Sequence, residues 1–265
     1  MNQPGPSYLT SHQRLYPERW HHFYETQGLL LREISGLGQQ QGRIIVDMLW
    51  NQAGLYPGCS TIDLGCGTGW IALPLASKGA RVLAVDNSAA MLETLRQESR
   101  AFNLTTLETR HACWTTIACR QPFDLALAAC FPPALSPDGI ARMERLGKTC
   151  AFLLPSGGQG LPWIRNLWKT ICNRDPFSEP SRLQVALNYL MSAGKKPRLL
   201  PIKTPLVVDL PLEQVLDFYI GYFSLFEKTS SEITAVIQKE LEPFTHAGRV
   251  QTRMESCSEV IWWAS

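Results

Sequence analysis

The stretch TIDLGCGTGWIALPLAS, residues 61–77, joins a short apolar run to a glycine-rich turn and then to an apolar helical pattern. The run from Ser60 to Leu64 predicts a buried strand, and residues 70–77 predict a helix. Glycines at positions 65, 67 and 69 lack side chains, so a ligand can approach the backbone between the two elements closely. The stretch therefore predicts a strand–turn–helix unit with a ligand site at its turn.

A second apolar run, residues 81–85, predicts another strand, and it delivers a carboxylate at Asp86, 17 residues after Gly69. An acid at this position can accept hydrogen bonds from both hydroxyls of a ribose. Ser88 is a suitable N-cap for a helix that follows. The dinucleotide fingerprint needs a glycine at position 70, where this sequence has Trp70, so the spacing argues against an NAD site. The residues alone leave open that the turn merely caps one helix and that Asp86 merely begins another.

Residues 63–69, DLGCGTG, resemble motif I of class I SAM-dependent methyltransferases, and residues 85–92, VDNSAAML, look like motif II of that family. The resemblance covers about residues 40–160. It implies S-adenosyl-L-methionine (SAM) as cofactor and S-adenosyl-L-homocysteine as product, with Asp63 supporting the loop and the cofactor ammonium and Asp86 binding the ribose. The cofactor-binding residues that it implies are Asp63, Gly65, Cys66, Gly67, Thr68, Gly69, Asp86, Asn87, Met91, Ala112, Cys113, Trp114, Ala129, Cys130 and Phe131.

The sequence departs from the family pattern after the third and fourth predicted strands. His111 stands where an acid is usual, and Trp114 can supply stacking surface for the adenine. His111 and Cys113 are also weak candidates for metal ligands, but no further ligand has suitable spacing, so no metal site is predicted. Phe131 replaces the polar residue of enzymes that methylate amino groups of nucleobases or glutamine, which argues against that substrate class. The Phe131 ring either packs near the sulfonium or is a plain core residue.

Further along the chain, strand patterns at residues 106–111, 123–130, 149–154, 198–208 and 250–263 alternate with helical patterns. This alternation predicts an α/β fold with a seven-stranded, mostly parallel, doubly wound sheet. The expected organisation is a single methyltransferase domain, residues 1–265. It comprises an N-terminal helical cap at 8–51, a SAM-binding core at 60–160 and a helical insertion at 211–243, before the last strand and over the substrate site.

Catalytic residues are not fixed by the sequence, and the candidates are Tyr24, His22 and Tyr222. Residues 20–24, WHHFY, loosely resemble the aromatic segment that many small-molecule methyltransferases fold over the cofactor. The helical stripe with Tyr219 and Tyr222 indicates either packing or a pocket lining. We expect residues 8–33 and 212–241 to form a lid over the carboxyl edge of the sheet, where ligands of doubly wound folds bind.

Composition narrows the function classes. The 265 residues include 25 basic and 23 acidic side chains, for a net charge of +2, which does not favour a nucleic-acid or anionic-membrane surface. Eight cysteines without a CxxC pair, and no apolar segment of membrane-spanning length, favour a reduced, cytoplasmic protein. We therefore expect methyl transfer to a small-molecule acceptor, with no nucleic-acid or membrane partner. A protein or RNA methyltransferase, or a non-catalytic SAM-binding protein, remains an alternative, and the oligomeric state is open.

Overall fold

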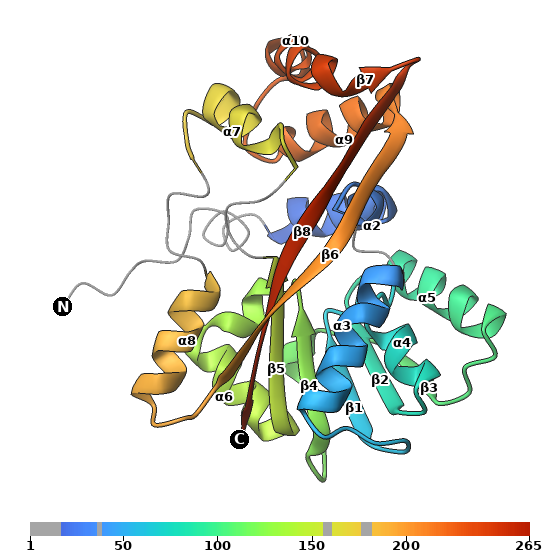
Figure 1. The fold of residues 1–265 in the computed structure, drawn as a ribbon, viewed down its shortest axis with the longest axis vertical. Helices are drawn as coiled ribbons and strands as arrows, with labels where there is room; N and C mark the ends of the chain where they lie inside the picture. Colours follow the sequence, from blue (N-terminus) through green and yellow to red (C-terminus); the bar gives the residue numbers. More distant parts are fainter. Residues whose placement is uncertain (1–16, 36–38, 156–160, 176–181) are drawn as a thin grey trace. The chain divides into compact units, whose positions relative to one another are not determined.

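The computed structural model describes residues 17–35, 39–155, 161–175 and 182–265, and it divides the chain into two compact units (Figure 1). The sheet unit consists of Leu37–Ser156, Arg182–Thr204 and Cys257–Ser265. The helical unit consists of Met1–Gly36, Gly157–Ser181 and Pro205–Ser256. The chain passes between the units several times, so each unit is built from segments that are distant in the sequence.

The sheet has the strand order β3-β2-β1-β4-β5-β8-β6, and the short β7 pairs with β8. Strands β1 to β5 are parallel to one another, whereas β8 is antiparallel to β5. This arrangement confirms the predicted mostly parallel, doubly wound fold. The strands are β1 (Ser60–Leu64), β2 (Arg81–Asp86), β3 (Leu107–His111), β4 (Phe123–Ala129), β5 (Gly147–Pro155), β6 (Arg198–Pro211), β7 (Thr245–His246) and β8 (Arg249–Ala264).

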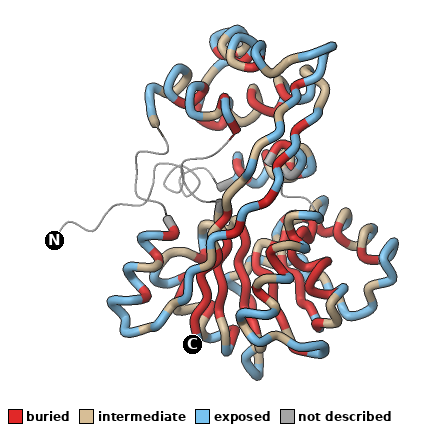
Figure 2. The backbone as a smooth tube through the Cα atoms, in the orientation of Figure 1, coloured by how far each residue is buried: buried red, intermediate tan, exposed pale blue. Residues whose placement is uncertain are grey.

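The helices of the sheet unit cover both faces of its sheet. They are α3 (Gln39–Gln52), α4 (Ala72–Ser77), α5 (Ala89–Ala101), α6 (Pro137–Leu146) and α8 (Arg182–Ser192), with the short 3₁₀ helices η1 (Trp114–Thr116) and η2 (Pro132–Leu135). Alternate residues of each strand point to opposite faces. In β2, Val82 packs in the cluster of α3, α4 and α5, and Leu83 packs in the cluster of α6 and α8. Figure 2 shows the resulting concentration of buried backbone in the parallel strands.

The helical unit has a hydrophobic core of its own. It contains α2 (Pro17–Ser35), α7 (Ile164–Cys172), α9 (Leu212–Ser224), α10 (Ser230–Leu241) and the 3₁₀ helix η3 (Glu242–Phe244), together with β7 and parts of β6 and β8. Aromatic rings fill this core: the Trp20 ring lies edge-on to Tyr222 and Phe226, with centroids 6.1 and 5.9 Å away. The predicted helices at 212–241 are present, and they pack with α2 and α7.

Within the described part of the chain, no helix combines the length and the apolar character that a membrane crossing requires.

Candidate functional site

The glycine turn follows β1 and is fastened to the end of β2. The backbone N–H groups of Gly65 and Cys66 both donate to the carbonyl of Val85, at 2.8 and 3.1 Å. Gly65, Gly67 and Gly69 have φ values of 68°, 52° and 83°, in the left-handed region that side chains disfavour. The turn thus holds its backbone close to the carboxyl ends of two adjacent parallel strands, where ligands bind in such sheets.

The three glycines have different neighbours. A Cβ atom on Gly65 would lie 2.3 Å from the Phe131 ring, and a Cβ atom on Gly69 would lie 2.2 Å from Leu95 Cδ1. Packing inside the protein therefore requires both of these glycines. At Gly67 the nearest atom to such a Cβ would be Met91 Sδ, at 3.4 Å, so this position borders open space. Gly67 is the glycine of the turn that leaves room for a ligand.

Asp86, at the end of β2, links the two loops of the site. Its Oδ2 accepts a hydrogen bond from the Gly67 N–H at 2.8 Å, and its Oδ1 accepts one from the Ser88 N–H at 2.8 Å. The Ser88 hydroxyl accepts from the Met91 N–H and caps α5, as the sequence predicts. A carboxylate oxygen can accept more than one hydrogen bond. Asp86 therefore organises the glycine turn and still has acceptor capacity for hydroxyl groups.

Asp63 is a buried carboxylate directly before the turn, with 1% of its surface exposed. Its Oδ1 is completely buried and has no hydrogen-bond partner among the described residues. Burial, together with the nearby charge of Asp86, raises the pKa of Asp63 to about 7. Buried polar atoms almost always have a partner, so this oxygen indicates a missing donor. An ammonium group meets that need, so the chain's own residues fit the amino-acid end of SAM.

The loop after β3 forms a wall beside the turn. The Ala112 N–H donates to the carbonyl of Asp86 at 3.0 Å, which fixes the loop to the end of β2. His111 Nε2 lies 3.0 Å from the carbonyl oxygen of Asn87. The Trp114 ring stands edge-on to Phe131, with centroids 5.6 Å apart. Of the predicted cofactor residues, the structure thus brings those of the turn, of the β2 loop and of the β3 loop together.

His111 and Cys113 are both exposed at this loop, and the Cys113 thiol lies 3.0 Å from the Thr115 hydroxyl. Within the described residues, no three His, Cys, Asp or Glu side chains are grouped so that they can hold a metal ion.

The exit from β4 has an unusual backbone. Cys130 has a φ of 52°, which is uncommon for a residue other than glycine, and its N–H donates to the carbonyl of Leu153 at 2.7 Å. The chain then places the Phe131 ring against Gly65. Burial raises the pKa of the Cys130 thiol to about 12, and it also raises that of Cys66. Burial therefore favours the neutral form of both thiols.

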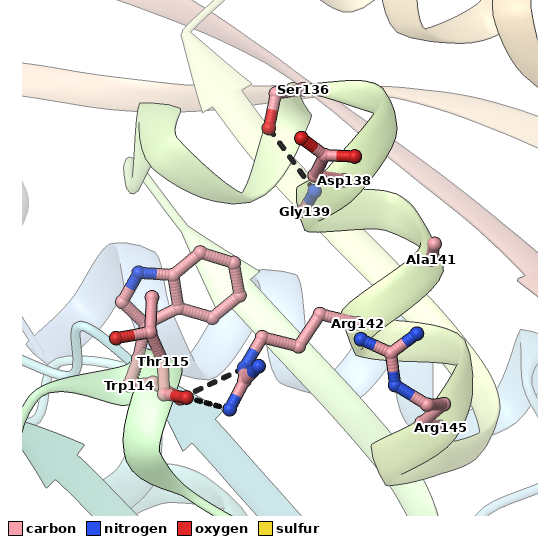
Figure 3. A pocket seen from close by; sticks show the side chains of 8 residues that line it. All are labelled: Trp114, Thr115, Ser136, Asp138, Gly139, Ala141, Arg142 and Arg145. Atoms are coloured by element: carbon pink, nitrogen blue, oxygen red, sulfur yellow. Dashed lines mark hydrogen bonds between the residues drawn. The ribbon is translucent and has the colours of Figure 1, made fainter.

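Sequence reasoning missed a cavity of about 410 Å³ between η1 and α6 (Figure 3). Arg142 enters it from α6 and donates hydrogen bonds to the η1 segment. The Ser136 hydroxyl accepts from the Gly139 N–H and caps α6 at the other end of the cavity. The Ser-Pro pair at 136–137 was the available sequence signal for this helix start. The cavity is lined by Trp114, Thr115, Ser136, Asp138, Gly139, Ala141, Arg142 and Arg145.

The catalytic candidates His22, Tyr24 and Tyr222 all belong to the helical unit. His22 is exposed, and Tyr24 is half-buried beside the Trp20 ring. The Tyr222 ring stacks on Phe218 within the aromatic core, and burial raises the pKa of its hydroxyl well above the usual value. Tyr222 is thus a neutral phenol near pH 7. The catalytic role of all three stays a prediction.

Comparisons with known proteins agree with this geometry. Residues 62–150 match the family model described as a methyltransferase domain. A protein-L-isoaspartate O-methyltransferase from Methylorubrum populi is 31% identical over 121 residues, which cover 44% of this chain and 55% of that protein. The (S)-coclaurine N-methyltransferase from Thalictrum flavum is 35% identical over 85 residues, which cover 31% of this chain and 24% of that enzyme. The matched stretch thus spans about half of the first relative's length and a quarter of the second's.

Among solved structures, the YcgJ protein from Bacillus subtilis superposes with a TM-score of 0.53 at 12% identity, covering 83% of this chain and 97% of that one. A likeness at this identity establishes the fold. The family model adds the sequence signature, because it begins within β1 and includes the glycine turn and Asp86. Residues 62–150 of this chain thus match a methyltransferase domain, and the chain has the class I methyltransferase fold.

Proposed function

We propose that this protein transfers the methyl group of SAM to a small-molecule acceptor by in-line displacement. The observation that supports SAM binding most directly is the unpartnered Oδ1 of Asp63, buried beside a turn whose middle glycine borders open space. A carboxylate there suits an ammonium group, and the unobstructed Gly67 suits a chain of methylene groups passing over the backbone.

Within this proposal, different residues of the site bind different parts of the cofactor. Asp63 accepts from the amino-acid end, and Asp86 accepts from the ribose hydroxyls while its bonds to Gly67 and Ser88 hold the loops. Trp114 flanks the adenine. Phe131 turns a ring toward the site, and an aromatic face attracts a cation. When bound, SAM supplies a methyl group already activated by the positive sulfonium, so the protein's task is to orient the acceptor and exclude water.

The small-molecule acceptor is supported by composition and by one relative. A net charge of +2 does not favour RNA as the acceptor. Aromatic side chains of α2 and α9 pack together in the helical unit. Aromatic residues with a few polar groups are typical of pockets that bind small molecules. The coclaurine N-methyltransferase relative is named for a small-molecule acceptor. The isoaspartate methyltransferase relative favours a protein acceptor instead, and this second candidate enters the test below.

We also propose a cytoplasmic location. All eight cysteines are reduced in the structure, which suits a reducing compartment.

Calorimetry with SAM, S-adenosylhomocysteine and NAD tests the cofactor assignment. We expect both SAM and S-adenosylhomocysteine to bind and NAD not to bind. Asp86→Ala removes a charged acceptor, so it should weaken binding of S-adenosylhomocysteine at least about tenfold. Gly67→Val, whose side chain would enter the ligand's space, should abolish it. Glu108→Ala, which removes an exposed carboxylate on β3, is the control. Binding of NAD without SAM would overturn the assignment.

Acceptor class is tested with SAM labelled in its methyl group. The purified protein is incubated with a metabolite extract, an isoaspartyl peptide and total RNA in separate reactions. We expect label in the small-molecule fraction alone. Label in the peptide would favour the second candidate, and SAM binding without transfer in any reaction would indicate a non-catalytic binding protein.

A further inference from the structure

Arg142, on α6, clamps the loop that follows β3. Its Nε donates to the carbonyl of Trp114 at 3.3 Å, and its Nη2 donates to the carbonyls of Ile117, at 3.2 Å, and of Thr115. The guanidinium carbon also lies over the Trp114 ring, 5.9 Å from its centroid. Figure 3 shows the side chain reaching from the helix across the cavity to the carbonyl of Thr115. One side chain thus bonds three backbone carbonyls of a single short segment.

The clamped segment has little structure of its own. It is one 3₁₀ turn, Trp114–Thr116, closed by the N–H groups of Thr116 and Ile117, and the Thr115 and Thr116 side chains are exposed. Single 3₁₀ turns have poor hydrogen-bond geometry and are weak in isolation. Hydrogen bonds from a charged donor are roughly twice as strong as neutral ones. The position of Trp114 therefore depends on Arg142.

Trp114 is connected to the proposed cofactor site by direct contacts. Its ring meets Phe131 edge-on, and the Phe131 ring lies against Gly65, where an added Cβ would come within 2.3 Å of it. A shift of Trp114 would free Phe131 and loosen the packing on the glycine turn. Among the described residues, Arg142 forms no hydrogen bond or ring contact with Phe131 or with the turn, so its influence passes through Trp114.

We infer that Arg142 is a positioning residue for the adenine end of the cofactor: it holds the Trp114 segment as one wall of that subsite. The inference rests on the proposed function. It adds a residue from α6, outside the motifs that the sequence comparison recognises, to the determinants of cofactor affinity.

Arg145 provides a matched control. It lies on the same helix and lines the same cavity, so it has the same charge and nearly the same setting (Figure 3). Its side chain is exposed and forms no hydrogen bond or ion pair with any described residue. Removal of the Arg145 side chain therefore removes one positive charge and part of the cavity lining, but it breaks no hydrogen bond to the Trp114 segment.

Calorimetry with S-adenosylhomocysteine compares Arg142→Ala, Arg142→Lys and Arg145→Ala with the wild type. We expect Arg142→Ala to weaken binding about tenfold and Arg145→Ala to change it less than about twofold. Arg142→Lys keeps the charge but cannot bond several carbonyls with one planar group, so it should recover only part of the affinity. Ethylguanidinium at millimolar concentration can enter the vacated cavity, and it should restore affinity to Arg142→Ala without affecting the wild type.

Methylthioadenosine, which lacks the amino-acid end, supplies a second readout. Arg142→Ala should weaken methylthioadenosine and S-adenosylhomocysteine by the same factor, whereas Asp63→Asn should weaken S-adenosylhomocysteine alone. Equal affinities of Arg142→Ala and the wild type, or equal losses in Arg142→Ala and Arg145→Ala, would overturn the inference. A loss for S-adenosylhomocysteine without one for methylthioadenosine would also overturn it. If the wild type binds neither ligand, the proposed function itself fails.

Discussion

Asp63 shows how a single buried carboxyl can link cofactor binding to pH. Its pKa of about 7 lies above the usual value near 4, because burial and the charge of Asp86 disfavour the ionised form. In the unfolded chain Asp63 ionises near pH 4. The folded protein therefore loses stability as the pH rises from about 4 to about 7, and the loss is complete above that range.

Asp63→Asn should consequently stabilise the free protein, with a gain that grows between pH 5 and pH 8. Three pKa units correspond to on the order of 4 kcal/mol, which is the upper limit of the gain because the new amide also needs partners. Urea unfolding at the two pH values measures it. Asp124→Asn is the control: Lys148 and Ser60 lower the pKa of Asp124 to about 2, so its substitution should destabilise the protein equally at both pH values. A gain from Asp63→Asn that does not change with pH would contradict the account.

At the scale of single residues, the sequence predicted which residues belong to the site better than it predicted their contacts. The glycine spacing singled out Gly67 and Asp86, and the motif resemblance added Asp63. The structure places Asp86 against the Gly67 N–H and near Asp63. The sequence did not indicate that Asp86 bonds the turn itself, because such a bond depends on the approach of two loops. Arg142 was missed for the same reason: α6 and the β3 loop are 25 or more residues apart in the hydrogen bonds that join them.

Helix α5 begins after Ser88, which the sequence predicts as its N-cap. Ser88 accepts the Met91 N–H at 3.2 Å. Ser88→Ala should destabilise the protein by about 1 kcal/mol, because an N–H group of the first turn loses its acceptor. Thermal unfolding measures the change. Thr94→Ala, a partly exposed position in the same helix, should be neutral or slightly stabilising. Equal effects of the two substitutions would mean that the cap contributes nothing.

Element boundaries were predicted best where burial is strongest. The limits of β1 agree with the sequence pattern, since a short apolar run between polar turns has few alternatives. The limits of β6 and β8 were less certain. Both strands are longer than predicted, 14 and 16 residues, because their alternating burial continues beyond the apolar runs. The short amphipathic helix α7 was not predicted as a separate element.

For the whole molecule, the fold class was predictable from strand and helix alternation, but the division into two units was not. The helical unit gathers α2, α7, α9 and α10 from three separate parts of the chain, and nothing local in the sequence records that association. The predicted cap at residues 8–51 is therefore divided. Its helix α2 shares a hydrophobic core with the predicted insertion, whereas its helix α3 packs in the sheet unit. Part of the predicted lid, residues 8–16, lies outside the described residues.

Hydrogen exchange with and without S-adenosylhomocysteine tests the lid hypothesis. We expect protection to rise in the glycine turn and also in α2 and α9, because a lid that closes on bound ligand loses opening motions. Wild-type protein with NAD is the control and should show no change. If only the glycine turn responds, the helical unit is a scaffold and not a lid.

The position of β8 has a consequence for biosynthesis. Although β8 follows the other strands of the sheet in the sequence, it pairs with β5 in the finished sheet and lies between β5 and β6. Until it emerges, the edge of β5 exposes Ala151, Phe152 and Leu153, which are buried in the native protein. Unpaired apolar strand edges promote aggregation. The nascent chain should therefore depend on a holdase chaperone until β8 has been synthesised, and truncation before residue 249 should yield insoluble protein.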